Sequence, residues 1–345
     1  MARRRPTISD VAARAGVSKS AVSFVLNGRG GVSDATQARI QAAVRELGWQ
    51  PSVRGRALSN ARAYAVGIVL NRPAYLLAAD PFYAGFVAGV ESVLAHHDHS
   101  LLLRVVDDGG DAAQRAHRAL WSAGRVDGFL VLDLEHGDPR LATVVEQRVP
   151  AVAVGRVARD DVPWIAIDDR TGYADALRHL IDLGHRRIAH VSGPPRYVHA
   201  AARHDVWADE LARAGLHRGP LARGDFSAAG GAKATRELLD GGPPFTAIAY
   251  ANDVMALAGL QVLRRAGIAV PDDVSVVGFD DIHTAELSAP TLTTVTQDAQ
   301  RWGAEAASAL LVRIETGQGP TGLVGDSELV VRGSTGPAPR RDPRS

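Results

Sequence analysis

The chain has 345 residues, 46% of them hydrophobic and 22% charged, which is enough for two or three domains with substantial cores. No apolar run reaches the ~18 residues that a membrane-spanning helix needs, and no apolar core of about 7–15 residues follows the basic first residues as in a secretory signal. The absence of cysteine excludes disulfides and thiolate catalysis. We therefore expect a cytoplasmic protein with no membrane contact.

The formal net charge of +1 hides an asymmetry along the chain. Residues 1–62 contain 11 Lys and Arg against three Asp and Glu, whereas the remainder contains 28 against 35. A small basic segment on an acidic body indicates that only this segment meets a polyanion such as nucleic acid. A basic segment that is merely solvated is the alternative.

The first 48 residues are predicted to form three short helices. Thr7 is placed as the N-cap of the first, and Gly16 permits a sharp turn before Ser18 begins the second. Ser33 begins the third helix, which ends at Gly48. A helix, a tight glycine turn and a second helix are typical of a helix-turn-helix, whose second helix enters the DNA major groove. The alternative is a small helical cap on an enzyme.

From Tyr64 onward, short β-branched runs alternate with amphipathic helices such as Gly85–Ala95, Gly172–Leu183 and Met255–Ala266. This alternation predicts parallel sheets with both faces covered by helices. The stretch is too long for one small sheet, so we expect two similar lobes with a ligand cleft beyond the carboxyl ends of their strands. The expected strands are Val66–Leu70, Leu101–Val106, Gly128–Leu132, Ala151–Val154, Ile165–Ile167, Ile188–Val191, Ala247–Tyr250 and Val274–Phe279.

Several short motifs follow one another in a specific order between Thr7 and about Thr335. They include Thr7-Ile8-Ser9-Asp10-Val11-Ala12, Ala15-Gly16-Val17-Ser18, Asp80-Pro81-Phe82-Tyr83, Leu183-Gly184-His185-Arg186-Arg187-Ile188-Ala189, Asn252-Asp253 and Val277-Gly278-Phe279-Asp280-Asp281. In this order and spacing the motifs resemble the lac repressor-type family of transcriptional regulators.

The resemblance implies an N-terminal all-α helix-turn-helix domain (1–49), a hinge (50–63) and a two-lobed α/β core like that of periplasmic binding proteins, built on doubly wound parallel sheets (64–335). The chain should cross between the lobes three times. Lobe 1 would then comprise about 64–168 and 299–326, lobe 2 about 169–298 and 327–335, and residues 336–345 a disordered tail. Members usually bind near-palindromic double-stranded operator DNA as homodimers. No leucine-heptad tail follows the core, which favours a dimer, and nucleoid association is expected.

In the positions that match the family, Lys19, Ser20 and Phe24 would contact bases from the second helix. Phe24 departs from the polar or basic residue that is usual there; it would pack on thymine methyl groups or, alternatively, join the core of the head. Ala21 departs from the usual threonine. Contacts to the DNA backbone, which position the protein without reading sequence, would come from Thr7, Ser23, Asn27, Ser33 and Thr36.

In relatives the hinge becomes a helix only on the operator, and a leucine from each subunit wedges into the minor groove. Leu58 is the matching residue, and such a wedge unstacks a base step and kinks the duplex. A flexible linker with an incidental leucine is the alternative. Gly55 stands where the family prefers alanine, at a cost of about 1 kcal/mol to a helix.

The matching cleft positions have side chains suited to a polyol, with carboxylates, an amide and guanidinium groups that bind adjacent hydroxyls. Phe226 would stack on a sugar ring, whereas Arg203 has the alternative of a surface ion pair and Asp280 that of a turn cap. Asp80 departs from the usual asparagine, and the stretch Asn71–Ala79 before it would form a lid or part of a dimer surface. The expected ligand-binding residues are Asp80, Phe82, Tyr83, Arg156, Asp168, Arg203, Phe226, Asn252 and Asp280.

The function implied is therefore a repressor of carbohydrate-related genes that a small-molecule effector, a sugar, releases from DNA through a shift between two lobe arrangements. A corepressor-dependent regulator and a sugar-binding protein without a DNA function are the alternatives. No enzyme is expected, because no nucleophile elbow or phosphate loop is present. No cofactor or metal is expected either, since His96, His97 and His99 lie at a helix end where solvation is the simpler interpretation.

Overall fold

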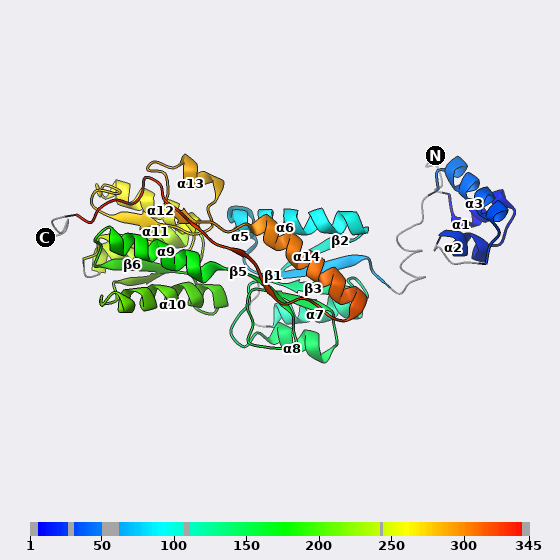
Figure 1. The fold of residues 1–345 in the computed structure, drawn as a ribbon, viewed down its shortest axis with the longest axis horizontal. Helices are drawn as coiled ribbons and strands as arrows, with labels where there is room; N and C mark the ends of the chain where they lie inside the picture. Colours follow the sequence, from blue (N-terminus) through cyan, green and yellow to red (C-terminus); the bar gives the residue numbers. More distant parts are fainter. Residues whose placement is uncertain (1–5, 27–30, 50–61, 107–110, 242–243, 340–345) are drawn as a thin grey trace. The chain divides into compact units, whose positions relative to one another are not determined.

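The computed structural model describes residues 6–26, 31–49, 62–106, 111–241 and 244–339. These residues belong to two compact units, Met1–Ala63 and Tyr64–Ser345 (Figure 1). The positions Asn27, Gly55 and Leu58, and most of the expected hinge, lie outside the described residues.

The first unit contains three helices, α1 (Ile8–Ala15), α2 (Lys19–Leu26) and α3 (Asp34–Leu47). Thr7 caps the N-terminus of α1 in a capping box. Its hydroxyl and its backbone N–H both donate to the Asp10 carboxylate, and its hydroxyl oxygen accepts from the Asp10 N–H. Gly16 ends α1 with φ 65°, in the left-handed region that favours glycine. Val11, Val22 and Ile40 are fully buried between the helices, and the predicted helix-turn-helix is confirmed.

The second unit begins with a six-stranded parallel sheet in the order β11-β5-β4-β3-β1-β2. Helices α6 and α14 cover one face and α7 and α8 the other (Figure 1). We call this part lobe 1. Its elements are β1 (Ala65–Asn71), α5 (Ala74–Ala79), α6 (Pro81–Leu94), the 3-10 turn η1 (Ala95–His97), β2 (Ser100–Val106), α7 (Ala112–Ser122), β3 (Gly128–Val131), α8 (Pro139–Glu146), β4 (Ala151–Val154), β5 (Trp164–Asp168), α14 (Ala299–Thr316) and β11 (Gly322–Asp326).

Lobe 2 contains a four-stranded parallel sheet in the order β7-β6-β8-β9 and a short antiparallel pair, β10 and β12. Helices α9 and α10 pack together on one side and α11 and α12 on the other (Figure 1). Its elements are α9 (Asp169–Asp182), β6 (Ile188–Ser192), α10 (Val198–Arg213), β7 (Leu221–Arg223), α11 (Ala228–Gly241), β8 (Ala247–Tyr250), α12 (Asp253–Arg265), β9 (Ser275–Val277), α13 (His283–Leu287), β10 (Thr294–Val295) and β12 (Leu329–Val330).

The chain passes between the lobes three times, after β5, after β10 and after β11. The first and third crossings are joined, because the Ser327 hydroxyl donates to the Asp168 carbonyl oxygen at 2.6 Å and accepts from the Gly172 N–H at 3.2 Å. Each lobe is thus discontinuous in sequence, and the predicted doubly wound, two-lobed fold is confirmed.

The structure corrects two expectations. The strand expected at Val274–Phe279 is limited to Ser275–Val277, because β9 pairs with β8 over these three residues alone. The C-terminal segment is not disordered over its first residues: the Gly336 N–H donates to the Ser275 hydroxyl at 3.0 Å, and the Ala338 N–H donates to the Leu183 carbonyl at 2.9 Å. These main-chain bonds hold residues 336–338 against lobe 2.

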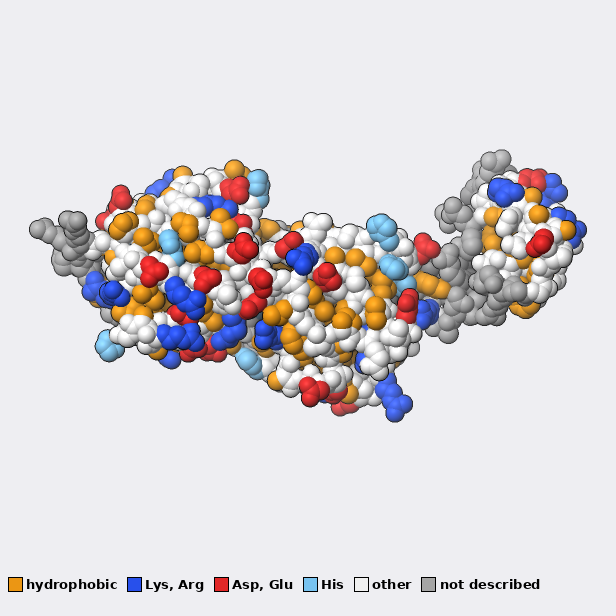
Figure 2. Space-filling model, viewed as in Figure 1, with side chains coloured by type: hydrophobic (Ala, Val, Ile, Leu, Met, Phe, Trp, Pro, Cys, Tyr) orange, Lys and Arg blue, Asp and Glu red, His pale blue; other side chains and the backbone are white. Residues whose placement is uncertain are grey.

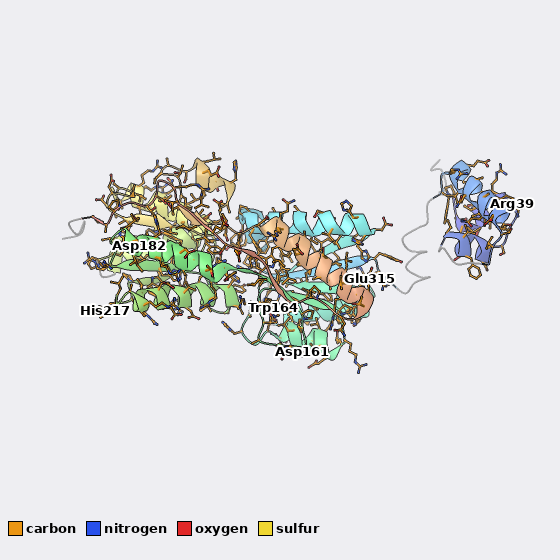
Figure 3. All side chains as sticks on the ribbon, in the orientation of Figure 1. Arg39, Asp161, Trp164, Asp182, His217 and Glu315 are labelled. Atoms are coloured by element: carbon orange, nitrogen blue, oxygen red, sulfur yellow. The ribbon has the colours of Figure 1, made fainter. Side chains whose placement is uncertain are left out.

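The outer surface of the core carries both signs of charge. On the visible face, Arg and acidic side chains are intermixed over both lobes (Figure 2). The side chains of Asp182 and Glu315 in the core and of Arg39 in the first unit, labelled in Figure 3, are exposed. Among the described helices, none is both long and apolar enough to cross a bilayer.

Candidate functional site

A cavity of about 260 Å³ lies between the two lobes of the core. Several of its polar residues, among them Arg156, Asn252 and Asp280, follow the carboxyl ends of strands, the position at which open α/β sheets bind ligands. Eight of the nine expected ligand-binding residues line it: Asp80, Phe82, Tyr83, Arg156, Arg203, Phe226, Asn252 and Asp280.

The ninth residue, Asp168, does not line the cavity, whereas its neighbour Asp169 does. The Asp168 carboxylate caps α9, accepting from the Thr171 hydroxyl at 2.8 Å and from the Thr171 N–H. Successive side chains at a strand end point in different directions, so only one of the two adjacent acids can face the cavity. The expectation for Asp168 is therefore corrected to Asp169.

Seven further residues with polar or aromatic side chains line the cavity and were not predicted: Arg72, Asp133, Asp169, Arg170, His199, Gln297 and Trp302. Four of them follow the carboxyl end of a strand, namely Arg72 after β1, Asp133 after β3, Asp169 after β5 and Gln297 after β10. The strand-end rule applied to every strand would have found Arg72, Asp133 and Asp169. His199 and Trp302 lie on helices and have no comparable signal.

On the lobe 1 side, Arg72, Asp133 and Tyr83 form a buried cluster. Arg72 donates to both oxygens of Asp133 at 3.0 and 2.8 Å, and the Tyr83 hydroxyl donates to Asp133 at 2.8 Å. Burial alone would raise the pKa of Asp133, but the Arg72 charge and hydrogen bonds outweigh it and hold the pKa below its ordinary value. Arg72 belongs to the Asn71–Ala79 stretch, which therefore contributes to the cavity wall.

On the lobe 2 side, Arg203 is 5% exposed and lies in the cavity wall, which excludes the alternative of a surface ion pair. Its Nη1 donates to the Ala251 carbonyl at 2.7 Å, and its guanidinium lies 3.6 Å from the centroid of the Phe279 ring. Asp169 lies 3.7 Å from its Nε, beyond hydrogen-bond distance, and this Nε has no hydrogen-bond partner among the described residues. The Arg203 guanidinium is thus held in place while its Nε–H can still donate a hydrogen bond to a ligand.

Asn252 and Asp80 each begin a helix while lining the cavity. Asn252 accepts from the Met255 N–H at 3.0 Å to cap α12, and its amide donates to the Phe226 carbonyl at 3.2 Å. Asp80 accepts from the Phe82 N–H at 3.0 Å to cap α6. Capping fixes both side chains at the cavity edge with little rotamer freedom.

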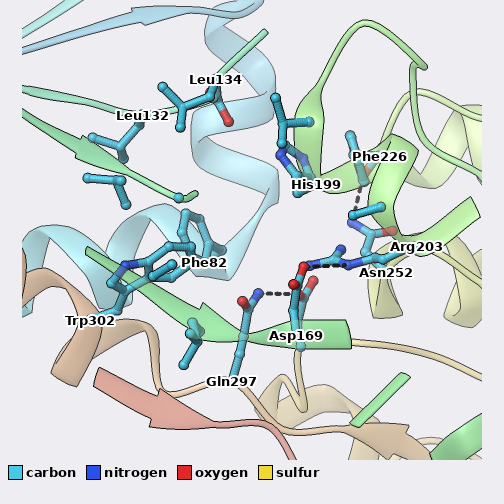
Figure 4. Close-up of a pocket in the computed structure, with 18 of the residues that line it drawn as sticks. Phe82, Leu132, Leu134, Asp169, His199, Arg203, Phe226, Asn252, Gln297 and Trp302 are labelled. Atoms are coloured by element: carbon cyan, nitrogen blue, oxygen red, sulfur yellow. Dashed lines mark hydrogen bonds and ion pairs between the residues drawn. The ribbon is translucent and has the colours of Figure 1, made fainter. Parts of the chain in front are cut away.

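Asp280 and Asp80 approach the cavity from opposite lobes. Asp280 lines the cavity, has φ 114° and accepts a short hydrogen bond from the amide of Gln297. Gln297 points into the cavity (Figure 4). Burial raises the pKa of Asp80 and raises that of Asp280 well above its ordinary value. Hydrogen-bond donors on a ligand would stabilise their ionised forms.

The aromatic residues divide between the lobes. The Phe226 ring is already covered by Arg72, 5.2 Å from its centroid, and by the His199 ring, also at 5.2 Å. Phe82 and Trp302 pack edge to face at 5.8 Å on the lobe 1 side, where the Trp302 indole N–H is bound to the Ile165 carbonyl (Figure 4). Phe82, Trp302 and Phe226 all line the cavity.

In the first unit, the three side chains expected to contact bases are exposed on α2. Lys19 and Ser20 are exposed at its start, and Phe24 is 42% exposed, which excludes the alternative that Phe24 joins the core. Val22 fills the inward face of the same helix. Ser18 caps α2 by accepting from the Ala21 N–H at 3.2 Å.

The residues expected to contact the DNA backbone have local partners. The Thr7 hydroxyl is engaged in the capping box with Asp10, and the Ser33 hydroxyl donates to Thr36 at 3.0 Å rather than capping α3. The Arg39 guanidinium also reaches the Thr36 hydroxyl, at 3.4 Å. Ser23 is half-buried on α2.

Within the described part of the chain, no cluster of three or more His, Asp or Glu side chains is arranged to hold a metal ion. The Nδ1 atoms of His96 and His99 each bind a nearby backbone carbonyl oxygen, of Ser92 and His97 respectively.

Comparisons with known proteins agree with this architecture. Residues 7–52 match the family model of bacterial regulatory proteins, lacI family, and residues 177–335 match that of the periplasmic binding protein-like domain. The chain is similar to the HTH-type transcriptional regulator CelR of Thermobifida fusca, with 39% identity over 96% of this chain and 99% of CelR. It is also similar to the HTH-type transcriptional repressor CytR of Escherichia coli (strain K12), with 33% identity over 95% of this chain and 96% of CytR.

Two solved structures resemble the chain, and each match covers 96% of this chain and 100% of the chain in the solved structure. The complex of the transcriptional regulator CelR with cellobiose has a TM-score of 0.74 at 36% identity. The lac repressor dimer bound to operator and the anti-inducer ONPF has a TM-score of 0.85 at 29% identity.

Proposed function

The chain belongs to the lacI family of bacterial regulatory proteins, and we propose that it represses carbohydrate-related genes until a sugar enters the cavity between its lobes. The observation that carries the sugar assignment is the composition of this cavity. A fixed guanidinium, two carboxylates with unused acceptor capacity and a pair of aromatic rings line one space of about 260 Å³. The complex of the relative CelR with cellobiose supports the same ligand class.

Within the cavity, each group would have a definite role. The planar guanidinium of Arg203 would donate hydrogen bonds to adjacent hydroxyls of the sugar. Asp80 and Asp280, which come from opposite lobes, would accept hydrogen bonds from other sugar hydroxyls. Phe82 and Trp302 would contact the apolar face of the ring. Because the groups come from both lobes, a bound sugar stabilises one lobe arrangement over another.

The DNA-binding role rests on the first unit. Lys19, Ser20 and Phe24 would read base edges in the major groove, with Thr7, Ser23, Asn27, Ser33 and Thr36 at the DNA backbone. Leu58 would be the minor-groove wedge. We also infer that the protein binds a near-palindromic operator as a homodimer, as in the lac repressor dimer bound to operator. Because its partner is DNA, we infer that it works in the cytoplasm at the nucleoid.

The mechanism is a shift of population between lobe arrangements. A ligand changes operator affinity only through its different affinities for the two arrangements, and operator DNA then changes ligand affinity by the same factor. An inducing sugar prefers the arrangement that is incompatible with operator binding, whereas a corepressor prefers the other.

The test is capture of sheared genomic DNA by the full-length protein, followed by sequencing, with and without a panel of sugars. We expect enrichment of a short palindrome that one sugar abolishes. Enrichment that requires a small molecule would instead establish a corepressed regulator. Absence of enrichment under every condition would contradict the proposal.

A further inference from the structure

The two lobes touch at a place that is separate from the three crossings. We define the clasp as residues 134–136 of lobe 1 and residues 196–198 of lobe 2. The Val198 N–H donates to the Leu134 carbonyl at 2.9 Å and the His136 N–H donates to the Arg196 carbonyl at 3.3 Å, with Glu135 and Tyr197 forming an antiparallel bridge between them. Two segments far apart in sequence therefore join the lobes as a strand pair would.

A side-chain contact extends the clasp into the cavity. The Arg72 guanidinium, held on lobe 1 by both oxygens of Asp133, lies 4.1 Å from the centroid of the Tyr197 ring on lobe 2. Tyr197 is 1% exposed, and His199 stacks on it with ring centroids 5.6 Å apart and planes 15° apart. Arg196 donates to the Tyr197 hydroxyl at 2.8 Å and pairs with Glu135 at 3.4 Å.

The clasp and the crossings lie on different sides of the cavity. In Figure 4, Leu134 of the clasp and His199, which directly follows the clasp, lie in the upper half. Asp169 and Gln297, which adjoin crossings, lie in the lower half. The crossings connect the lobes covalently and so persist in any lobe arrangement. The clasp contacts exist only while the lobes are closed on that side.

The geometry points to a role for Arg72: we propose that it is a positioning residue of the effector site, which holds the lobes closed across the cavity by stacking on Tyr197 before any sugar enters. A buried guanidinium over an aromatic face is a desolvated cation–π contact, and its planar shape suits stacking in a way that an ammonium does not. The Asp133 carboxylate, which also accepts from the Tyr83 hydroxyl, fixes the guanidinium in that plane.

The proposal deepens the proposed function, since lobe spacing determines how well a ligand fits, but its test needs no ligand. The chain has no cysteine, so Ala119→Cys on α7 of lobe 1 and Ala212→Cys on α10 of lobe 2 introduce two exposed labelling sites. Fluorescence energy transfer between the labels in the sugar-free, full-length protein reports the distribution of interlobe distances. If no sugar released DNA in the genomic capture experiment, the interlobe distances of the sugar-free protein would still test this proposal.

Four variants are compared in this background. Arg72→Ala removes the guanidinium, and Tyr197→Leu removes the ring while leaving the Arg72–Asp133 pair intact. Tyr197→Phe is the matched control, because it keeps the ring and loses only the hydroxyl. Arg178→Ala removes an ion pair of 3.0 Å with Glu210 that lies within lobe 2 and is the control for general destabilisation.

We expect Arg72→Ala and Tyr197→Leu to raise the ratio of open to closed lobes by about tenfold, which corresponds to ~1.4 kcal/mol. Tyr197→Phe and Arg178→Ala should leave this ratio as in the wild type. Arg72→Ala leaves a buried carboxylate unpaired, so if that variant does not fold, Tyr197→Leu decides. Unchanged interlobe distances in a folded Tyr197→Leu variant, or equal opening in Tyr197→Phe, would overturn the proposal.

Discussion

Single residues in the cavity combine a structural role with the ligand-binding role proposed for them. Asn252 and Asp80 cap helices, and Arg203 binds a backbone carbonyl, so each is held in place before a ligand arrives. Asn252 and Asp80 could be predicted because they stand in recognisable motifs, Asn252-Asp253 and Asp80-Pro81-Phe82-Tyr83. Arg72 stands in no such motif; only its place directly after β1 indicates a cavity position, and its partner Asp133 lies 61 positions away in sequence.

Asp253, next to Asn252, is fully buried and makes stability depend on pH. Its carboxylate accepts from the Thr294 hydroxyl at 2.6 Å and from the Ile282 N–H at 3.0 Å, and burial raises its pKa to about 7. The folded protein therefore keeps a proton that the unfolded chain loses near its ordinary pKa of 3.8. The contribution to stability is present below that ordinary value and is lost as pH rises to about 7.

Asp253→Asn should remove this pH dependence, since the amide does not ionise. Relative to the wild type, the variant should gain stability between pH 4 and pH 8, by up to roughly 4 kcal/mol. The free energies of unfolding of both proteins, measured in urea across this range, check the prediction. A difference between them that does not change with pH would contradict it.

Phe24 is exposed on α2 beside Lys19 and Ser20. Phe24→Ala should weaken operator binding by about fivefold, because an apolar contact with thymine methyl groups is worth ~1 kcal/mol or more. The Tm of the protein should not change, since the side chain is outside the core of the first unit. A lower Tm with unchanged operator affinity would show that Phe24 serves the fold instead.

At the scale of elements, helices were predicted well where a local signal marks their ends. Thr7, Gly16 and Gly48 stand at the ends of α1 and α3 as expected. Strands were missed where tertiary pairing alone defines them: β7 has a single buried residue, and β10 and β12 have two residues each. Such short segments have no periodicity to detect.

The crossing of α6 and α14 depends on two glycines. A Cβ at Gly89 would lie 1.8 Å from the Gln300 carbonyl oxygen, and one at Gly303 would lie 2.1 Å from that of Phe86. Gly89→Ala must therefore separate two helices that together cover one face of the lobe 1 sheet. We expect a loss of about 1–3 kcal/mol of stability, despite the better helix propensity of alanine.

Gly322→Ala is the matched control for this prediction, since a Cβ there meets no atom within 4 Å. Thermal unfolding of the two variants beside the wild type is the measurement. A Tm for Gly89→Ala equal to that of Gly322→Ala would show that the helices do not meet as closely as described.

At the scale of the whole molecule, charge separates the two binding functions. Residues 1–62 carry 11 basic against three acidic residues, while the cavity pairs Arg72 with Asp133 and places Arg203 beside Asp169. Operator affinity should therefore fall steeply with salt, with a slope in log units of roughly −0.9 for each phosphate contact. Sugar affinity measured by calorimetry should barely change over the same range. A similar salt dependence for both ligands would contradict this division.

The overall architecture could be predicted because many short motifs matched one family in order and spacing. The clasp could not be predicted, because it joins residues 134–136 to residues 196–198 through main-chain atoms that leave no trace in the sequence.

The central claim is that a sugar in the cavity controls operator binding. The most direct test is a fluorescence anisotropy titration of the captured operator with the wild type and with Arg203→Ala, over a range of concentrations of the releasing sugar. We predict equal operator affinity without sugar, and release of the variant only at about 10–100-fold higher sugar concentration, as expected from the loss of charged hydrogen bonds. Release of both proteins at the same sugar concentration would contradict the account.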